Sequence, residues 1–163
     1  MTRNTAMAGT TGETLTVTIT EQLTIDSRDY GGKQAMTISS IVDVSRRLVT
    51  VTTTEATVAT FSAAIGAGNY IAADVMYMRF TNLDDTNFLT LTFRNQDNDE
   101  FAVKLDAGKS FIWCGDNSNG MAAVFNATQD ADAASSANFG SLTNIQADAD
   151  SASCDLEMLI ASV

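Results

Sequence analysis

Histidine and proline are both absent from the 163 residues of this chain. Histidine is the commonest general base and metal ligand in proteins, so its absence excludes the usual serine and cysteine triads. The absence of proline suits a backbone that donates hydrogen bonds along β-ladders, because proline in a sheet is confined to edges, strand starts and bulges. No glycine-rich nucleotide-binding fingerprint is present either. We therefore expect a protein that is not an enzyme, with a hydrolase that uses two loop carboxylates as the alternative.

Cysteine is scarce, with Cys114 and Cys154 as the only two. A single pair so far apart in sequence is no disulfide framework, and each residue falls in an apolar pattern. We therefore expect two buried thiols, with a bridge as the alternative. Two soft ligands do not make a zinc site, so we expect no cofactor and no metal. Calcium held between oxygen-rich turns such as QDNDE and DNSNG remains the open alternative.

Basic residues are few: nine Lys and Arg stand against twenty Asp and Glu, which gives a net charge of -11. No Lys or Arg follows Lys109. Such a field repels phosphate groups, so we expect no nucleic-acid partner. The acidic second half is either a solvated surface or the attachment site of a basic partner.

Long apolar runs are also missing, since none approaches the roughly 20 residues that span a bilayer. The first twelve residues contain no continuous apolar core of a signal peptide. We therefore expect neither a membrane span nor a secretory leader.

What the chain does have is strict alternation of apolar and polar residues, beginning with Leu15, Val17 and Ile19 between threonines. The pattern predicts two long antiparallel strands, over residues 14–25 and 36–44, joined by the turn-rich residues 26–32. Residues 48–61 follow as one long or two short strands, and shorter segments of strand type lie at residues 75–82, 88–95, 101–105, 110–114, 121–126, 142–145 and 154–160. Short strands separated by Asp-, Asn- and Gly-rich turns are typical of a sandwich or barrel.

The fold class that we predict is all-β. The prediction is a single-domain antiparallel β-sandwich, jelly-roll-like, with about 8 to 10 strands. Residues 1–12 are expected to form a flexible N-terminal arm and residues 13–163 the β-sandwich domain. The clear alternation over residues 154–160 places the last strand inside a sheet.

Two further features have alternative interpretations. Arg46 and Arg47 are the only adjacent basic pair, and they are either strand-edge charges that prevent aggregation or a salt-sensitive contact with an acidic neighbour. Five aromatic residues are either a sugar-binding platform or, more simply, core. They are Tyr70, Tyr77, Phe80, Phe88 and Trp113.

Residues 70–113 carry a resemblance to a family. Residues 77–82 read Y-x-R-x-x-N at the end of a strand, and residues 104–110 read K-L-x-A-G-x-S in a hairpin. This block resembles small β-sandwich virion proteins of tailed, especially marine, bacteriophages.

The resemblance implies a structural virion protein, a capsid decoration (cement) protein that binds and stabilises the phage head as an oligomer. Its implied partners are the phage major capsid protein and copies of itself, with a trimer favoured. Its implied location is the particle surface, after synthesis in the host cytoplasm. The alternative is a tail- or fibre-associated module of the same fold that binds a receptor or glycan.

For such a protein, the small-residue N-terminus would suit an arm that orders on a neighbouring subunit, with a frayed terminus as the alternative. The candidate interface residues are Thr2, Arg3, Asn4, Thr5, Met7, Arg46 and Arg47.

Overall fold

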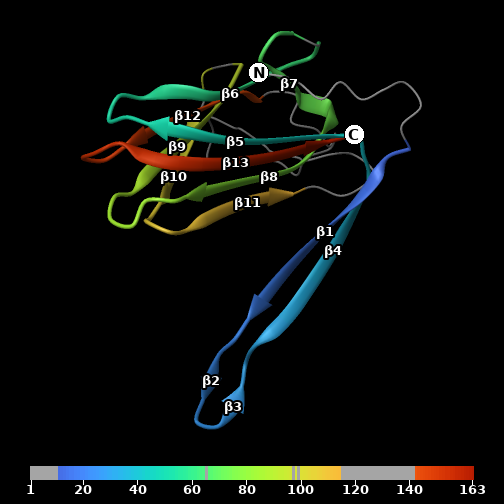
Figure 1. Ribbon diagram of the computed structural model, residues 1–163, viewed down its shortest axis with the longest axis vertical. Helices are drawn as coiled ribbons and strands as arrows, with labels where there is room; N and C mark the ends of the chain where they lie inside the picture. Colours follow the sequence, from blue (N-terminus) through green and yellow to red (C-terminus); the bar gives the residue numbers. More distant parts are fainter. Residues whose placement is uncertain (1–10, 65, 97, 99, 115–141) are drawn as a thin grey trace.

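The computed structural model describes residues 11–64, 66–96, 98, 100–114 and 142–163 (Figure 1). Within these residues strands dominate, and the helical content is one short 3-10 helix, η1 (Ala72–Asp74). No helix in the described part of the chain has the length and hydropathy to cross a membrane. The prediction of an all-β sandwich is confirmed.

Two sheets pack face to face and form the body of the protein (Figure 1). The five-stranded sheet has the order β10 (Glu100–Leu105), β9 (Leu89–Asn95), β12 (Leu142–Ala149), β6 (Ala56–Ser62) and β7 (Tyr70–Ile71). The four-stranded sheet has the order β11 (Ser110–Cys114), β8 (Val75–Asn82), β13 (Cys154–Ser162) and β5 (Asp43–Val51). These two sheets contain nine of the thirteen strands that the structure describes.

The strand order is that of a rolled hairpin. Apart from β7, the strands pair as β9 with β10, β8 with β11, β6 with β12 and β5 with β13, all antiparallel. Each pair therefore encloses the previous one, and the turn between β9 and β10 is the tip of one long hairpin that has rolled into two layers. This arrangement is a jelly roll.

The core lies between the two layers and follows the two-residue period of a strand. Met78 and Phe80 from β8 face Leu91 and Phe93 from β9, and all four are fully buried. The rings of Phe80 and Phe93 meet edge to face with centroids 6.2 Å apart. The last strand, β13, lies between β8 and β5, so the prediction that it belongs inside a sheet is confirmed.

The first two long strands lie outside both layers. β1 (Glu13–Glu21) pairs with β4 (Gly32–Ile41), and the short strands β2 (Thr24–Ile25) and β3 (Arg28–Asp29) form its tip. The predicted pair of long antiparallel strands joined by a loop is therefore present. It projects from the body as a separate hairpin (Figure 1), which we call the hairpin arm, residues 13–41.

Candidate interaction surface

The root of the hairpin arm packs on the outer face of the four-stranded sheet. A second apolar cluster joins three arm residues to three sheet residues: Val17, Ile38, Ile41, Met76, Tyr77 and Ala161. Where the chain leaves the arm, the backbone N–H of Val42 donates a hydrogen bond of 2.9 Å to the carbonyl oxygen of Ser162. Full burial of a large apolar side chain contributes about 1.5 to 3 kcal/mol, so these contacts fix the arm to the body at this end.

The apolar side chains of the arm become more exposed toward its tip. Val17 is 9% exposed at the root, whereas Ile19 is 41%, Leu23 51%, Ile25 50% and Tyr30 59% exposed. A two-stranded hairpin has no second layer on which to bury such residues, and in isolation it is only marginally stable. The distal arm therefore presents an apolar series to its surroundings.

The tip of the arm is a two-residue turn between Ile25 and Arg28. Its central residues, Asp26 and Ser27, have φ angles of 49° and 64°. Two positive φ angles in a two-residue connection are the type I′ geometry, whose twist matches that of the flanking strands. The turn therefore specifies a tight hairpin end, although a side chain in this region costs about 1 kcal/mol per residue.

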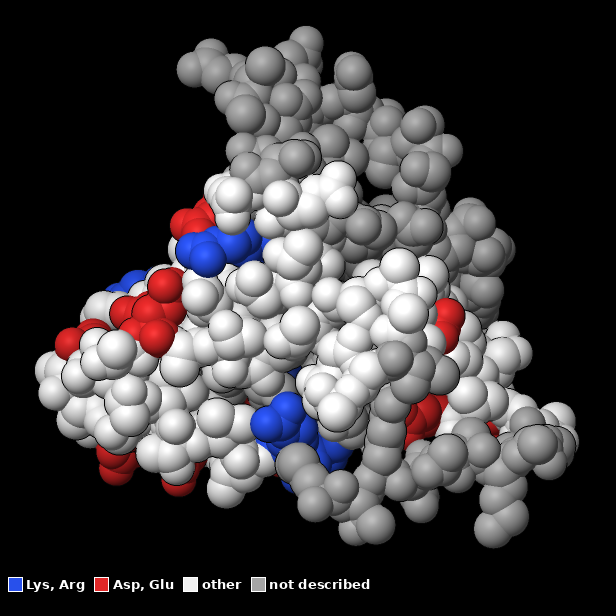
Figure 2. Space-filling view, turned by 90° about the horizontal axis from the view of Figure 1, so that it is seen from above, with Lys and Arg blue, Asp and Glu red and all other residues white. Residues whose placement is uncertain are grey.

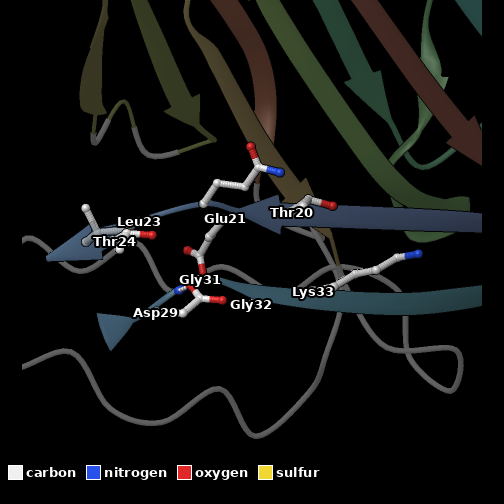
Figure 3. A pocket seen from close by; sticks show the side chains of 9 residues that line it. Thr20, Glu21, Leu23, Thr24, Asp29, Gly31, Gly32 and Lys33 are labelled. Atoms are coloured by element: carbon white, nitrogen blue, oxygen red, sulfur yellow. Dashed lines mark hydrogen bonds between the residues drawn. The ribbon is translucent and has the colours of Figure 1, made fainter. Parts of the chain in front are cut away.

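A hollow of about 600 Å³ lies where the tip bends away from the main strands of the arm (Figure 3). Gly31 makes the bend possible, because a side chain there would come within 2.5 Å of the backbone oxygen of Glu21. Asp29 accepts a hydrogen bond of 2.8 Å from the N–H of Gly31. Glu21 and Asp29 give the hollow two carboxylates, and Lys33 lines it from β4.

Two carboxylates alone are a small ligand set, since calcium takes six to eight oxygen ligands. Among the described residues there is no group of three or more His, Cys, Asp and Glu that could hold a metal ion. The turns with the richest supply of oxygen ligands, around residues 96–100 and 116–120, lie partly or wholly outside the described residues. The calcium alternative stays untested there.

Beyond the arm root, the outer face of the four-stranded sheet carries an ionic network. Glu157 on β13 accepts hydrogen bonds from Arg46 on β5 through Oε2 and from Arg79 on β8 through Oε1, each at 2.5 Å. The hydrogen bond from Arg46, together with the positive charges of both arginines, lowers the pKa of the Glu157 carboxyl. Two guanidinium groups share one carboxylate, so this part of the face has an excess of positive charge.

Three exposed apolar side chains flank the network. They are Val44, 53% exposed, Leu48, 64% exposed, and Ile112, 36% exposed. The strand register places Leu48 opposite Glu157 and Ile112 opposite Arg79. The outer face beyond the arm root is therefore a mixed surface of apolar side chains around two arginines.

The adjacent arginines Arg46 and Arg47 lie on β5, the last strand of its sheet, as the strand-edge interpretation predicts. They point to opposite sides of the sheet. Arg46 joins the outer network, whereas Arg47 is half-buried and its enclosed Nε atom has no hydrogen-bond partner among the described residues. The other predicted interface residues lie outside the described residues: Thr2, Arg3, Asn4, Thr5 and Met7.

The aromatic candidates pack against the protein. Tyr77 and Phe80 are buried. The hydroxyl of Tyr70 is hydrogen bonded to that of Ser45 at 2.9 Å, and Phe88 lies 4.4 Å beneath the ammonium group of Lys104. Trp113 meets Phe93 edge to face, with centroids 5.4 Å apart. These contacts favour the core interpretation over a sugar-binding platform.

Both cysteines are free thiols. Cys154 is buried, as predicted, and its burial raises the pKa of the thiol. Cys114 is only half-buried, and its Sγ atom lies 3.4 Å from Sδ of Met36 on the arm.

The carboxylate of Asp84 is bound within a turn. It accepts hydrogen bonds from the backbone N–H groups of Asn87, at 2.6 Å, and Thr86, at 2.8 Å. These hydrogen bonds lower the pKa of the Asp84 carboxyl. A carboxylate used in this way shapes the connection between β8 and β9.

Charged side chains are dispersed on the described part of the face that Figure 2 shows. Blue and red groups form small separate clusters there, and most of the described surface is uncharged. Three of the seven acidic residues that follow Lys109, Asp116, Asp130 and Asp132, lie outside the described residues.

Comparisons of the chain with protein-family models, with curated proteins and with solved structures found no match.

Sequence reasoning identified Arg46 but missed most of this surface. It did not find Glu157 and Arg79, because the hydrogen bonds between Glu157 and the two arginines join residues 78 and 111 positions apart. It also did not predict that the apolar positions of the distal arm are exposed. Strand length gives no signal for this, because β1 and β4, at nine and ten residues, are matched by the body strands β5 and β13, at nine residues each.

Proposed function

We propose that the chain is a structural protein of a bacteriophage particle, a decoration protein that binds the assembled head and stabilises it as an oligomer. The observation that carries the proposal is the hairpin arm. Its root is anchored in the body, while its distal half exposes Ile19, Leu23, Ile25 and Tyr30. Exposed apolar surface on an extended element marks a site of protein association.

The fold supports the same class of function by analogy. Jelly rolls are recurrent in viral capsid proteins and also in lectins, although a fold by itself does not define a function. The sequence resemblance of residues 70–113 to phage virion proteins favours the particle over the lectin. In the structure this block covers β7, η1, β8, β9 and β10 and most of β11.

Binding to capsids tests the proposal directly. Purified chain is sedimented with phage heads that lack it, over a protein titration at several salt concentrations. We expect saturable binding with a fixed number of copies per head and a higher melting temperature of the decorated head, because a ligand of the assembled state stabilises it by mass action.

A chain that remains in the supernatant with heads and instead binds the tail or host-cell fraction contradicts this proposal and supports the receptor- or glycan-binding alternative. The Leu83→Ser variant provides a matched control, because Leu83 is exposed in the turn after β8, away from the arm. Its binding should equal that of the wild type.

A further inference from the structure

We propose that the distal hairpin arm of one copy lies on the outer face of the four-stranded sheet of a second copy. Ile19, Leu23, Ile25 and Tyr30 are the donor residues, and Val44, Leu48 and Ile112 are the acceptor residues around Arg46. The contact rests on the proposed assembly of the chain with copies of itself, and it does not depend on the capsid.

The arm cannot cover this surface within its own molecule. Figure 1 shows the tip pointing away from the body, so the distal arm runs away from its own four-stranded sheet. From Val17 to Ile25 the arm extends for about 25 Å, at roughly 3.3 Å per residue. A second body at that distance can receive it.

The receiving face continues a surface to which the arm already binds. At the root, Val17 and Ile38 pack on Tyr77 and Ala161 of this same outer face. The next outward-facing row of the sheet, away from the arm root, holds Leu159, Arg79 and Ile112. The row after it holds Glu157 and Leu48. An apolar hairpin therefore already covers one half of the face, and the other half offers similar chemistry without a cover in the described structure.

Charge favours the same pairing. Between Ile19 and Gly32 the arm carries Glu21, Asp26 and Asp29 against a single cation, Arg28. The receiving face has Arg46 and Arg79 for one carboxylate, Glu157. Arg46 is available, because its side chain is 68% exposed. The remaining carboxylate of the face, Asp155, is bound to the hydroxyl of Thr50 at the end farthest from the arm root.

Donor and acceptor surfaces are different parts of the chain, so each copy can give one arm and receive another. Such a contact closes as a reciprocal dimer or as a ring. In either form the acidic tip of one copy lies beside the arginines of another. This local attraction offsets part of the repulsion between copies that each carry a net charge of -11.

Cysteine pairing between copies tests the contact. Ile25→Cys protein is mixed with Leu48→Cys protein that carries a mass tag, under mild oxidation. We expect a disulfide-linked heterodimer, with a yield at least tenfold above that of a mixture of Ile25→Cys with Leu83→Cys. Wild-type protein mixed with Ile25→Cys protein measures any reaction with the native Cys114.

The oligomeric state provides the second readout. Sedimentation velocity of the full chain is measured with Ile25→Asp, Leu48→Asp and, as the control, Leu83→Asp, each checked for native Trp113 fluorescence. We expect oligomers for the wild type and the control, and a dissociation constant raised at least tenfold for the other two. Oligomers unaffected by Ile25→Asp and Leu48→Asp, a monomeric wild type, or equal cross-linking yields would overturn the proposal.

The two proposals fail in different ways. If the chain binds capsids but its copies do not contact each other through the arm, only this contact is overturned. If the chain forms oligomers through the arm but does not bind capsids, only the proposed function is overturned.

Discussion

The thiol of Cys114 lies 3.4 Å from the thioether sulfur of Met36, so β11 of the body meets β4 of the hairpin arm at this point. The contact belongs to the apolar cluster at the arm root, in which both residues are partly buried. Cys114 is therefore a natural reporter of whether the arm is seated.

Replacement of Met36 by Ala should loosen the root of the arm. We expect a loss of about 1 to 2 kcal/mol, less than for a fully buried methionine. Alkylation of Cys114 should be several-fold faster than in the wild type, as measured by mass spectrometry after timed quenching. The buried Cys154 thiol has a raised pKa and should stay slow, because little of it is thiolate. Equal Cys114 rates in the two proteins would show that the arm root does not protect this thiol.

Phe93 is the central side chain of the aromatic core. It is fully buried, stacks on Phe101 with centroids 4.6 Å apart, and meets Phe80 and Trp113 edge to face. We expect Phe93→Ala to lower the free energy of unfolding by about 3 to 5 kcal/mol in a urea titration. Phe101→Ala is the control, since Phe101 is 37% exposed and should cost less than half as much.

The ionic network predicts a pH dependence with a definite sign. The pKa of Glu157 is lowered below its ordinary value of 4.5, so its stabilising contribution is fully present above about pH 4.5. It is lost as the pH falls through the lower folded-state pKa. Glu157→Gln should therefore be less stable than the wild type at pH 7, by about 0.5 kcal/mol for so exposed a pair.

The stability difference between Glu157→Gln and the wild type should shrink as the pH is lowered toward 3 in urea titrations. Asp155→Asn is the control, because Asp155 lies on the same strand but is bound by the Thr50 hydroxyl and by no arginine. A difference between Glu157→Gln and the wild type that stays constant with pH would contradict the assignment.

The tip turn can be improved. Ser27 has a φ angle of 64°, which glycine adopts without steric cost. Ser27→Gly should stabilise the tip by about 1 kcal/mol. This free energy corresponds to a roughly fivefold increase in the protection of the Tyr30 N–H against hydrogen exchange. That N–H donates to the carbonyl oxygen of Leu23 at 2.8 Å. Thr20→Gly is the control, because Thr20 lies in the extended strand β1, and it should lower the protection of the Tyr30 N–H. Protection below that of the wild type in Ser27→Gly would contradict the type I′ turn.

The strands of the body were predictable because their alternation is local. β13 buries nearly every second residue, and β8 does so from Met78 to Asn82. β12 was predicted only in part, over residues 142–145, yet it extends to Ala149 in the middle of its sheet. Its inward positions there are Ala147 and Ala149, both buried, and alanine carries little of the signal that marks a strand.

The strand order and the surface of the arm were not predictable from the sequence. Which strands pair depends on contacts between distant segments, such as Leu15 with Ile38 in the arm and Asp43 with Ser162 in the body. An apolar position such as Ile25 has the same pattern whether its cover comes from the same chain or from another one. Length and alternation therefore predict the hairpin, and they do not tell where it points.

The enclosure of early strands by late ones sets a delay during synthesis. Asp43, the first residue of β5, pairs with Ser162 at the end of β13. At 5 to 20 residues per second, roughly 6 to 24 seconds pass between their appearances on the ribosome. Among the strands that the structure describes, β5 pairs only with β13, and pairings of such long sequence separation also form slowly. During this interval β5 has no partner, and the charges of Arg46 and Arg47 disfavour its pairing with strands of other nascent chains on the same messenger RNA.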